Sequence, residues 1–144
     1  MDFDNINDEE RSARHVDYWL DLCDNELKIA HLLLKNKHYL YCGFFCHQIT
    51  EKALKAYCCY VNKEEKIPAK THSLHILIEN AGLKNALSPE QWKFIVSVDP
   101  LNIEARYPEY KRSIYSQLSV SGVCAQLYSQ TEEFFLWIKN KLSK

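Results

Sequence analysis

Apolar residues recur at steps of three and four along most of the chain, which is the spacing of amphipathic α-helices. The first series runs through residues 9–35, with acidic side chains between the apolar positions. Its apolar members are Val16, Trp19, Leu20, Cys23, Leu27, Ala30 and Leu34. The pattern therefore predicts one long helix with a single buried face.

A second series with the same period follows a short polar hinge at residues 36–38. Its members are Tyr39, Cys42, Cys46, Ile49, Ala53, Ala56, Tyr57 and Tyr60. Because the connection is so short, the second long helix is predicted to pack antiparallel to the first.

The middle of the chain carries loop and capping signals. Residues 63–71, KEEKIPAKT, are densely charged and include a proline, which predicts an exposed loop. Thr71 is predicted to cap a short third helix over residues 72–81, with Gly82 just beyond its end. Residues 88–91, Ser-Pro-Glu-Gln, form a capping-box pattern that predicts a fourth helix up to Pro100.

The last third contains an interruption and a final helix. Residues 101–115, LNIEARYPEYKRSIY, break the period with Pro108, and we expect them to cross the bundle as loop or broken helix. Residues 119–142 restore the period through Val120, Val123, Leu127, Phe134 and Ile138. No internal repeat or second domain is visible, so residues 1–144 are predicted to form one all-α antiparallel bundle of four to five helices.

Composition agrees with this fold class. A 144-residue chain that is 47% hydrophobic fits one core, and three Gly and four Pro offer little turn chemistry for a many-stranded sheet. The N-terminal residues are acidic and polar, and no apolar stretch has the length of a membrane span. We therefore expect a cytoplasmic protein that does not enter the membrane, with its six cysteines reduced.

Charge is distributed unevenly although the net charge is only −1. The first thirty residues carry nine acids against three bases, and the remainder of the chain is net +5. This asymmetry allows a basic patch that faces an anionic partner, but it is weaker than the balance of a dedicated nucleic-acid binder.

Cysteines and a histidine on the second predicted helix are candidate metal ligands. Cys42 and Cys46 are one turn apart beside His47, but no second pair has the spacing that would complete a tetrahedral site. Both cysteines also lie on the apolar stripe of the helix. We interpret them as buried small hydrophobic residues and expect neither a metal nor a cofactor.

Two histidine positions suggest acid–base or anion chemistry. His47 and Glu51 are four residues apart, the spacing of an acid/base pair, although a surface hydrogen bond is the favoured interpretation. Glu51 also precedes Lys55 by four residues, the favourable order for an ion pair within a helix. His72 and His75 flank the start of the predicted third helix, where backbone N–H groups favour an anion. A role in helix initiation without any ligand explains them as well.

Arg106-Tyr107-Pro108 is the strongest local signal. An arginine in a proline-fixed turn among tyrosines suits phosphate binding, while an aromatic ring can stack on a base. On residue types alone, a structural turn is an equally good interpretation.

Several of these segments together resemble the HEPN family over nearly the whole chain. They are CHQITEKALKAY (46–57), KTHSL (70–74), ARYP (105–108) and WIKNKL (137–142). The resemblance implies a helical bundle of the nucleotidyltransferase substrate-binding-subunit type, often a homodimer encoded beside a small nucleotidyltransferase. It also implies nucleotide binding or, in many branches, metal-independent endoribonuclease activity in toxin-antitoxin and defence systems.

The sequence departs from the ribonuclease branches, in which an arginine is followed four to six residues later by a histidine. No histidine occurs after His75. We therefore carry over only a nucleotide- or RNA-binding role and leave the catalytic residues unassigned. The candidate binding residues are Arg106, Tyr107, Lys52, Lys55 and His72.

The leading hypothesis is a binding module that works with a nucleotidyltransferase-like partner in a toxin-antitoxin or defence-type pair. Two alternatives stay open. One is an active metal-independent endoribonuclease toxin whose base is displaced to another position. The other is a purely structural dimerisation bundle.

Overall fold

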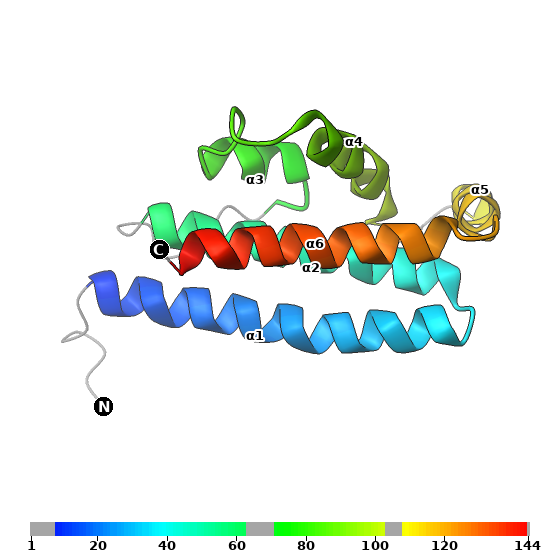
Figure 1. The fold of residues 1–144 in the computed structure, drawn as a ribbon, viewed down its shortest axis with the longest axis horizontal. Helices are drawn as coiled ribbons and strands as arrows, with labels where there is room; N and C mark the ends of the chain where they lie inside the picture. Colours follow the sequence, from blue (N-terminus) through cyan, green and yellow to red (C-terminus); the bar gives the residue numbers. More distant parts are fainter. Residues whose placement is uncertain (1–7, 63–70, 103–107, 144) are drawn as a thin grey trace.

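The computed structural model describes residues 8–62, 71–102 and 108–143, and every regular element in these ranges is helical (Figure 1). The elements are α1 (Asp8–Lys35), α2 (Tyr39–Val61), α3 (Leu74–Asn80), α4 (Pro89–Val98), the 3-10 helix η2 (Asp99–Leu101), α5 (Pro108–Leu118) and α6 (Val123–Leu142). The predicted all-α class is confirmed. The described ranges hold six α-helices, which is more than the four to five predicted.

Helix α2 lies at the centre of the bundle. It runs antiparallel to α1 after a tight turn in which Lys37 has a φ of 63°, and α6 lies beside both (Figure 1). Helices α3 and α4 cover a further side of α2, and α5 lies across the end of the bundle where α6 begins (Figure 1). More than half of the residues of α2 are consequently buried.

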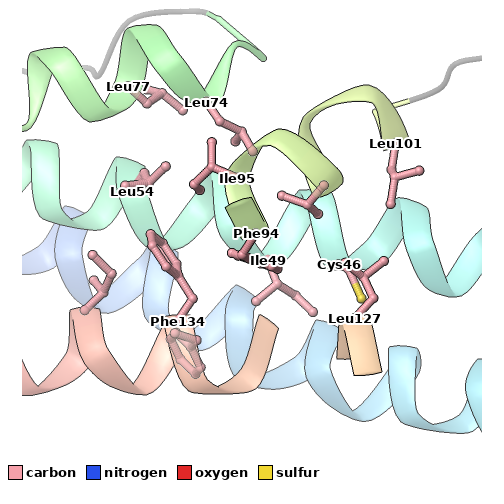
Figure 2. Close-up of a cluster of buried hydrophobic side chains, with 14 of the residues drawn as sticks. Cys46, Ile49, Leu54, Leu74, Leu77, Phe94, Ile95, Leu101, Leu127 and Phe134 are labelled. Atoms are coloured by element: carbon pink, nitrogen blue, oxygen red, sulfur yellow. The ribbon is translucent and has the colours of Figure 1, made fainter. Parts of the chain in front are cut away.

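The core is formed where the apolar faces of these helices meet on α2. Ile49 and Leu54 of α2 face Leu74 of α3, Ile95 of α4 and Phe134 of α6 (Figure 2). Fully burying each such side chain contributes about 1.5–3 kcal/mol, so tertiary packing, more than helix propensity, stabilises the short helices α3 and α4.

All six cysteines are free and buried. Cys42 and Cys46 have no exposed surface, which confirms their interpretation as small core residues. Burial also raises the pKa of the Cys23 thiol well above its usual value, so that this group stays protonated. Within the described ranges no three His, Cys, Asp or Glu residues gather where they could hold a metal ion.

Three helices are 20 residues or longer, which is the length needed to cross a bilayer. Among the helices described here, however, none is apolar enough over that length to be a membrane span.

The predicted cap of α4 is confirmed, whereas the predicted cap of α3 is wrong. Ser88 and Gln91 form the predicted capping box at α4, with N–H to side-chain oxygen distances of 3.1 and 2.8 Å. Helix α3 is capped by Ser73, whose hydroxyl accepts from the Ile76 N–H, and not by Thr71. The extended backbone of Ser73, with a φ of −77° and a ψ of 116°, sets this start, because an N-cap residue lies outside the helical conformation.

The last third also differs from the prediction. Residues from Pro108 onward form the regular helix α5 instead of a loop or broken helix, because proline is well tolerated at the first position of a helix. Helix α6 begins at Val123 and not at residue 119, since Gly122 takes a left-handed conformation with a φ of 81°. Val120, which was predicted to lie on the buried stripe, is therefore 60% exposed.

The contrast between two neighbours on α6 tests this packing. Phe135 is 1% exposed and Leu136 is 49% exposed. We expect Phe135→Ala to lower the free energy of unfolding by about 3–5 kcal/mol, and Leu136→Ala to change it by less than about 1 kcal/mol. Urea denaturation followed by circular dichroism measures both, and equal effects would show that α6 is docked through a different face.

Candidate functional site

A polar stripe runs along the otherwise apolar helix α2. Its members are Gln48, Glu51, Lys52 and Lys55. Glu51 and Lys52 each lie three or four residues from both Gln48 and Lys55, so the four side chains emerge on one side of the helix. His47 lies at the edge of this stripe. Side chains of the stripe contact α1 and the residues just before α3.

The carboxylate of Glu51 is the centre of the site. Its side chain is only 3% exposed, and a buried charge is costly unless it is paired and hydrogen-bonded. Oε2 accepts a hydrogen bond from Lys55 Nζ at 3.0 Å, which confirms the predicted ion pair within the helix. Oε1 lies 2.9 Å from Nδ1 of His72. Glu51 thus brings together two of the sequence-predicted binding residues.

His72 is held by this buried carboxylate although its own side chain is 67% exposed. An ionised carboxylate can only accept, so the hydrogen bond requires that Nδ1 carries the proton. In the neutral imidazole, Nε2 then bears the lone pair. No described residue binds Nε2. The arrangement therefore provides an oriented, accessible proton acceptor.

The two predicted basic residues of α2 are already paired with carboxylates. Lys52 Nζ lies 2.5 Å from Glu26 Oε1 of α1 and 3.3 Å from Gln48 Oε1. Lys55, besides binding Glu51, lies over the ring of Trp19 at 5.4 Å from its centroid. The described part of the site is therefore close to neutral, and the expected basic patch is weaker than the net charge of the later residues suggested.

His47 occupies a different environment from the one predicted. It has no exposed surface, and neither ring nitrogen has a hydrogen-bond partner in the described structure. Nδ1 is 3.9 Å from Glu51 Oε1, which is too long for a hydrogen bond. The predicted surface hydrogen bond between these residues is therefore wrong. Burial lowers the pKa of His47 to about 4, although the nearby charges of Glu51 and Asp99 act in the opposite direction.

The start of α3 already has an anionic group. Asp99 Oδ1 accepts a hydrogen bond from the Leu74 N–H at 3.3 Å, and Oδ2 is 3.6 Å from Nδ1 of His75. The His75 ring also packs against Trp92, with 5.8 Å between centroids. A protein carboxylate thus takes the place that the sequence suggested for an external anion.

Arg106 and Tyr107, the other two candidate binding residues, lie outside the described residues. The nearest described residue before them is Asn102, whose Oδ1 accepts from Gln48 Nε2 at 3.2 Å. The polar stripe of α2 thus borders the point at which the chain leaves η2. Neither Glu26 nor Asn102 was singled out from the sequence, because contacts to residues 26 and 54 positions away leave no local signal.

A cleft of about 430 Å³ lies in another part of the bundle, and its walls come from α4, η2, α5 and α6. Its described lining residues are Val96, Ser97, Pro100, Leu101, Gln117, Leu118, Val123, Gln126, Leu127 and Gln130. None of these side chains is charged, and none belongs to the Glu51 site. Its described walls therefore offer no group for acid–base chemistry.

Comparison with known proteins connects this geometry to a family. The sequence model of the HEPN domain matches residues 16–141, a range that includes the polar stripe and all elements from α2 to η2. No curated protein and no solved structure matched the chain.

The burial of His47 makes a prediction for the pH dependence of stability. Its pKa is about 4 in the folded protein and about 6.5 in the unfolded chain, so the unfolded state binds the extra proton between these values. The stabilisation that comes from keeping His47 neutral in the folded protein is therefore fully present above pH 6.5, and it is lost as the pH falls towards 4. The His47 contribution falls by up to about 1.4 kcal/mol per pH unit in this window.

We expect His47→Leu, which has a similar volume and no titrating group, to be less sensitive to acid than the parent protein. The groups around position 47, namely Glu51, Asp99 and His72, are retained in the variant and serve as the common background. Urea denaturation at pH 7, 6 and 5 measures the difference. Parallel stability curves for the two proteins would contradict the prediction.

Proposed function

We propose a function for this chain, which belongs to the HEPN domain family. In this proposal the protein binds a nucleotide or RNA at the Glu51 site of α2. The observation that carries the proposal is the exposed imidazole of His72, which the buried Glu51–Lys55 pair holds in place. An accessible polar group whose orientation is already fixed loses little conformational entropy when it binds a polar ligand, so it suits ligand recognition.

The proposed ligand contacts combine charge with stacking. Lys52 and Lys55 each retain N–H donors beyond those used on carboxylates, because an ammonium group has three. We propose that Arg106 pairs with a phosphate and that Tyr107 stacks on a base. Because the described site is nearly neutral, Arg106 provides the main phosphate-binding charge in this proposal.

The Arg106 contribution can be tested by comparison with Arg112, an exposed arginine of α5. We expect Arg106→Ala to weaken binding of a short fluorescent single-stranded RNA about 10-fold or more, because a charge-assisted hydrogen bond contributes about 1.5–3 kcal/mol. Arg112→Ala removes the same charge from an exposed position of α5 and is expected to change the Kd by less than about threefold. Fluorescence anisotropy at fixed ionic strength gives both values.

Equal weakening by the two substitutions would indicate diffuse electrostatic attraction and contradict the assigned role of Arg106. If the parent protein bound neither RNA nor free nucleotides such as ATP, the proposed function itself would be wrong.

The proposed cellular context is a cytoplasmic toxin-antitoxin or defence-type pair, in which the domain forms a homodimer and works with a nucleotidyltransferase-like protein. The family connection supports this context. Exposed apolar side chains at Tyr115, Val120 and Val123 are also available around the α5–α6 end.

Light scattering at micromolar concentration is expected to give twice the 17.0 kDa chain mass, and a monomer would contradict the dimer.

A further inference from the structure

A groove runs between α4 and α6 and shares no residue with the Glu51 site. The cleft of about 430 Å³ described above adjoins a second hollow of about 120 Å³, because Gln130 of α6 lines both. We call the cleft and the hollow together the α4–α6 groove. Pockets for small molecules usually have about 300–1,000 Å³, so the hollow has room for a single side chain and the cleft for something larger.

The hollow carries acidic groups above an apolar base. Besides Gln130, it is lined by Glu90, Gln91, Phe94, Glu133 and Phe134. The two phenylalanines are buried, with 5.6 Å between their ring centroids (Figure 2). Glu90 and Glu133 are exposed, and no described residue forms an ion pair or hydrogen bond with either carboxylate. Such a hollow suits a cationic side chain that buries its aliphatic stem and keeps its charged head at the carboxylates.

The cleft at the other end of the groove is neutral. Its apolar walls include the buried side chains of Leu118 and Leu127. Gln117, Gln126 and Gln130 add three amide groups, none of which forms a side-chain hydrogen bond with another described residue. An amide provides both donors and an acceptor, so this lining suits an apolar group that is attached to a neutral polar one, such as a peptide backbone.

We propose that the α4–α6 groove binds an extended peptide segment of a partner protein, with an apolar side chain in the cleft and a lysine or arginine in the hollow. Charge complementarity selects this occupant. The described lining of the groove has two carboxylates and no cation, so it repels the phosphates of RNA and of an anionic membrane. An extended segment also leaves its backbone N–H and C=O groups free to pair with the glutamine amides, whereas a helix pairs its own.

The length of the groove sets the spacing of the two side chains in the peptide. Gln126 and Glu133 are seven positions apart on α6, which corresponds to roughly 10 Å along the helix axis. A segment in the polyproline-II conformation advances about 3.1 Å per residue and repeats its side-chain direction every third residue. The apolar residue and the basic residue should therefore be three positions apart.

The test begins with short random peptides displayed on phage and selected on the full chain. We expect the enriched peptides to carry a lysine or arginine three positions from an apolar residue. The peptide enriched most strongly is then synthesised with a fluorescein label. Fluorescence anisotropy at fixed ionic strength gives its Kd for the parent protein and for each variant.

A charge reversal on α6 tests the acidic hollow. Glu133 and Glu132 are both exposed, but only Glu133 lines the groove. We expect Glu133→Lys to weaken peptide binding about 10-fold or more, because it places a like charge against the basic side chain of the peptide. The matched control Glu132→Lys makes the same change of charge outside the groove and should leave the Kd within about twofold.

A bulky substitution tests the cleft. Gln126 lines the cleft, whereas its neighbour Ala125 does not, and both are exposed. We expect Gln126→Trp to weaken peptide binding about 10-fold or more, because the indole occupies the space of the apolar side chain. Ala125→Trp should leave the Kd within about twofold. Substitutions at exposed positions change stability little, and circular dichroism checks that all four variants keep the fold of the parent.

The outcomes separate the possible occupants. The proposal is overturned if no peptide is enriched, or if the enriched peptide tolerates either Glu133→Lys or Gln126→Trp. A second copy of the chain is the alternative occupant. In that case light scattering would show that Gln126→Trp, but not Ala125→Trp, converts a dimer into a monomer, and this result would also overturn the proposal. RNA binding by Gln126→Trp should equal that of the parent, so failure at the groove leaves the proposed function untouched.

Discussion

The covering of α2 by other helices is the constraint on which the rest of the structure depends. A helix packed against α1, α3, α5 and α6 cannot expose its polar side chains freely, and several of them have partners inside the protein. The Thr50 hydroxyl donates to the Cys46 carbonyl of its own helix. Glu51 requires Lys55 and His72. The site therefore arises where the central helix carries a charge that the core cannot solvate.

The same packing brings opposite charges of distant helices together. Acidic side chains of α1 pair with bases contributed by later helices. Glu26 binds Lys52 of α2, and Asp24 lies 3.9 Å from Lys139 of α6. The second pair is exposed and contributes little, whereas the first is largely shielded from water. Part of the asymmetry is thus neutralised within the bundle.

Differences in burial give histidines of the same region chemically distinct environments. His47 is enclosed by the core and is kept neutral by desolvation. His72 is exposed at its Nε2 side and anchored at Nδ1. His75 is exposed but lacks a hydrogen bond to its neighbouring carboxylate. Among these three, only His72 combines an exposed ring with a hydrogen bond that fixes its orientation.

The sequence by itself determined the helical class, the long helices α1 and α2, and the capping box at Ser88, because these depend on local periodicity and short-range hydrogen bonds. It also indicated the Glu51–Lys55 pair, since its members are one turn apart. Segments spread along the chain carried the family resemblance, which the match over residues 16–141 confirmed.

Only the tertiary structure decided which polar residues meet. The contact of Glu51 with His72 joins residues 21 positions apart, and the contact of Glu26 with Lys52 joins residues 26 apart. Side-chain spacing within one helix cannot predict such pairs, because they depend on how two elements dock. The burial of His47 was missed for the same reason: helical periodicity gives the direction of a side chain, but the neighbouring helices decide whether water reaches it.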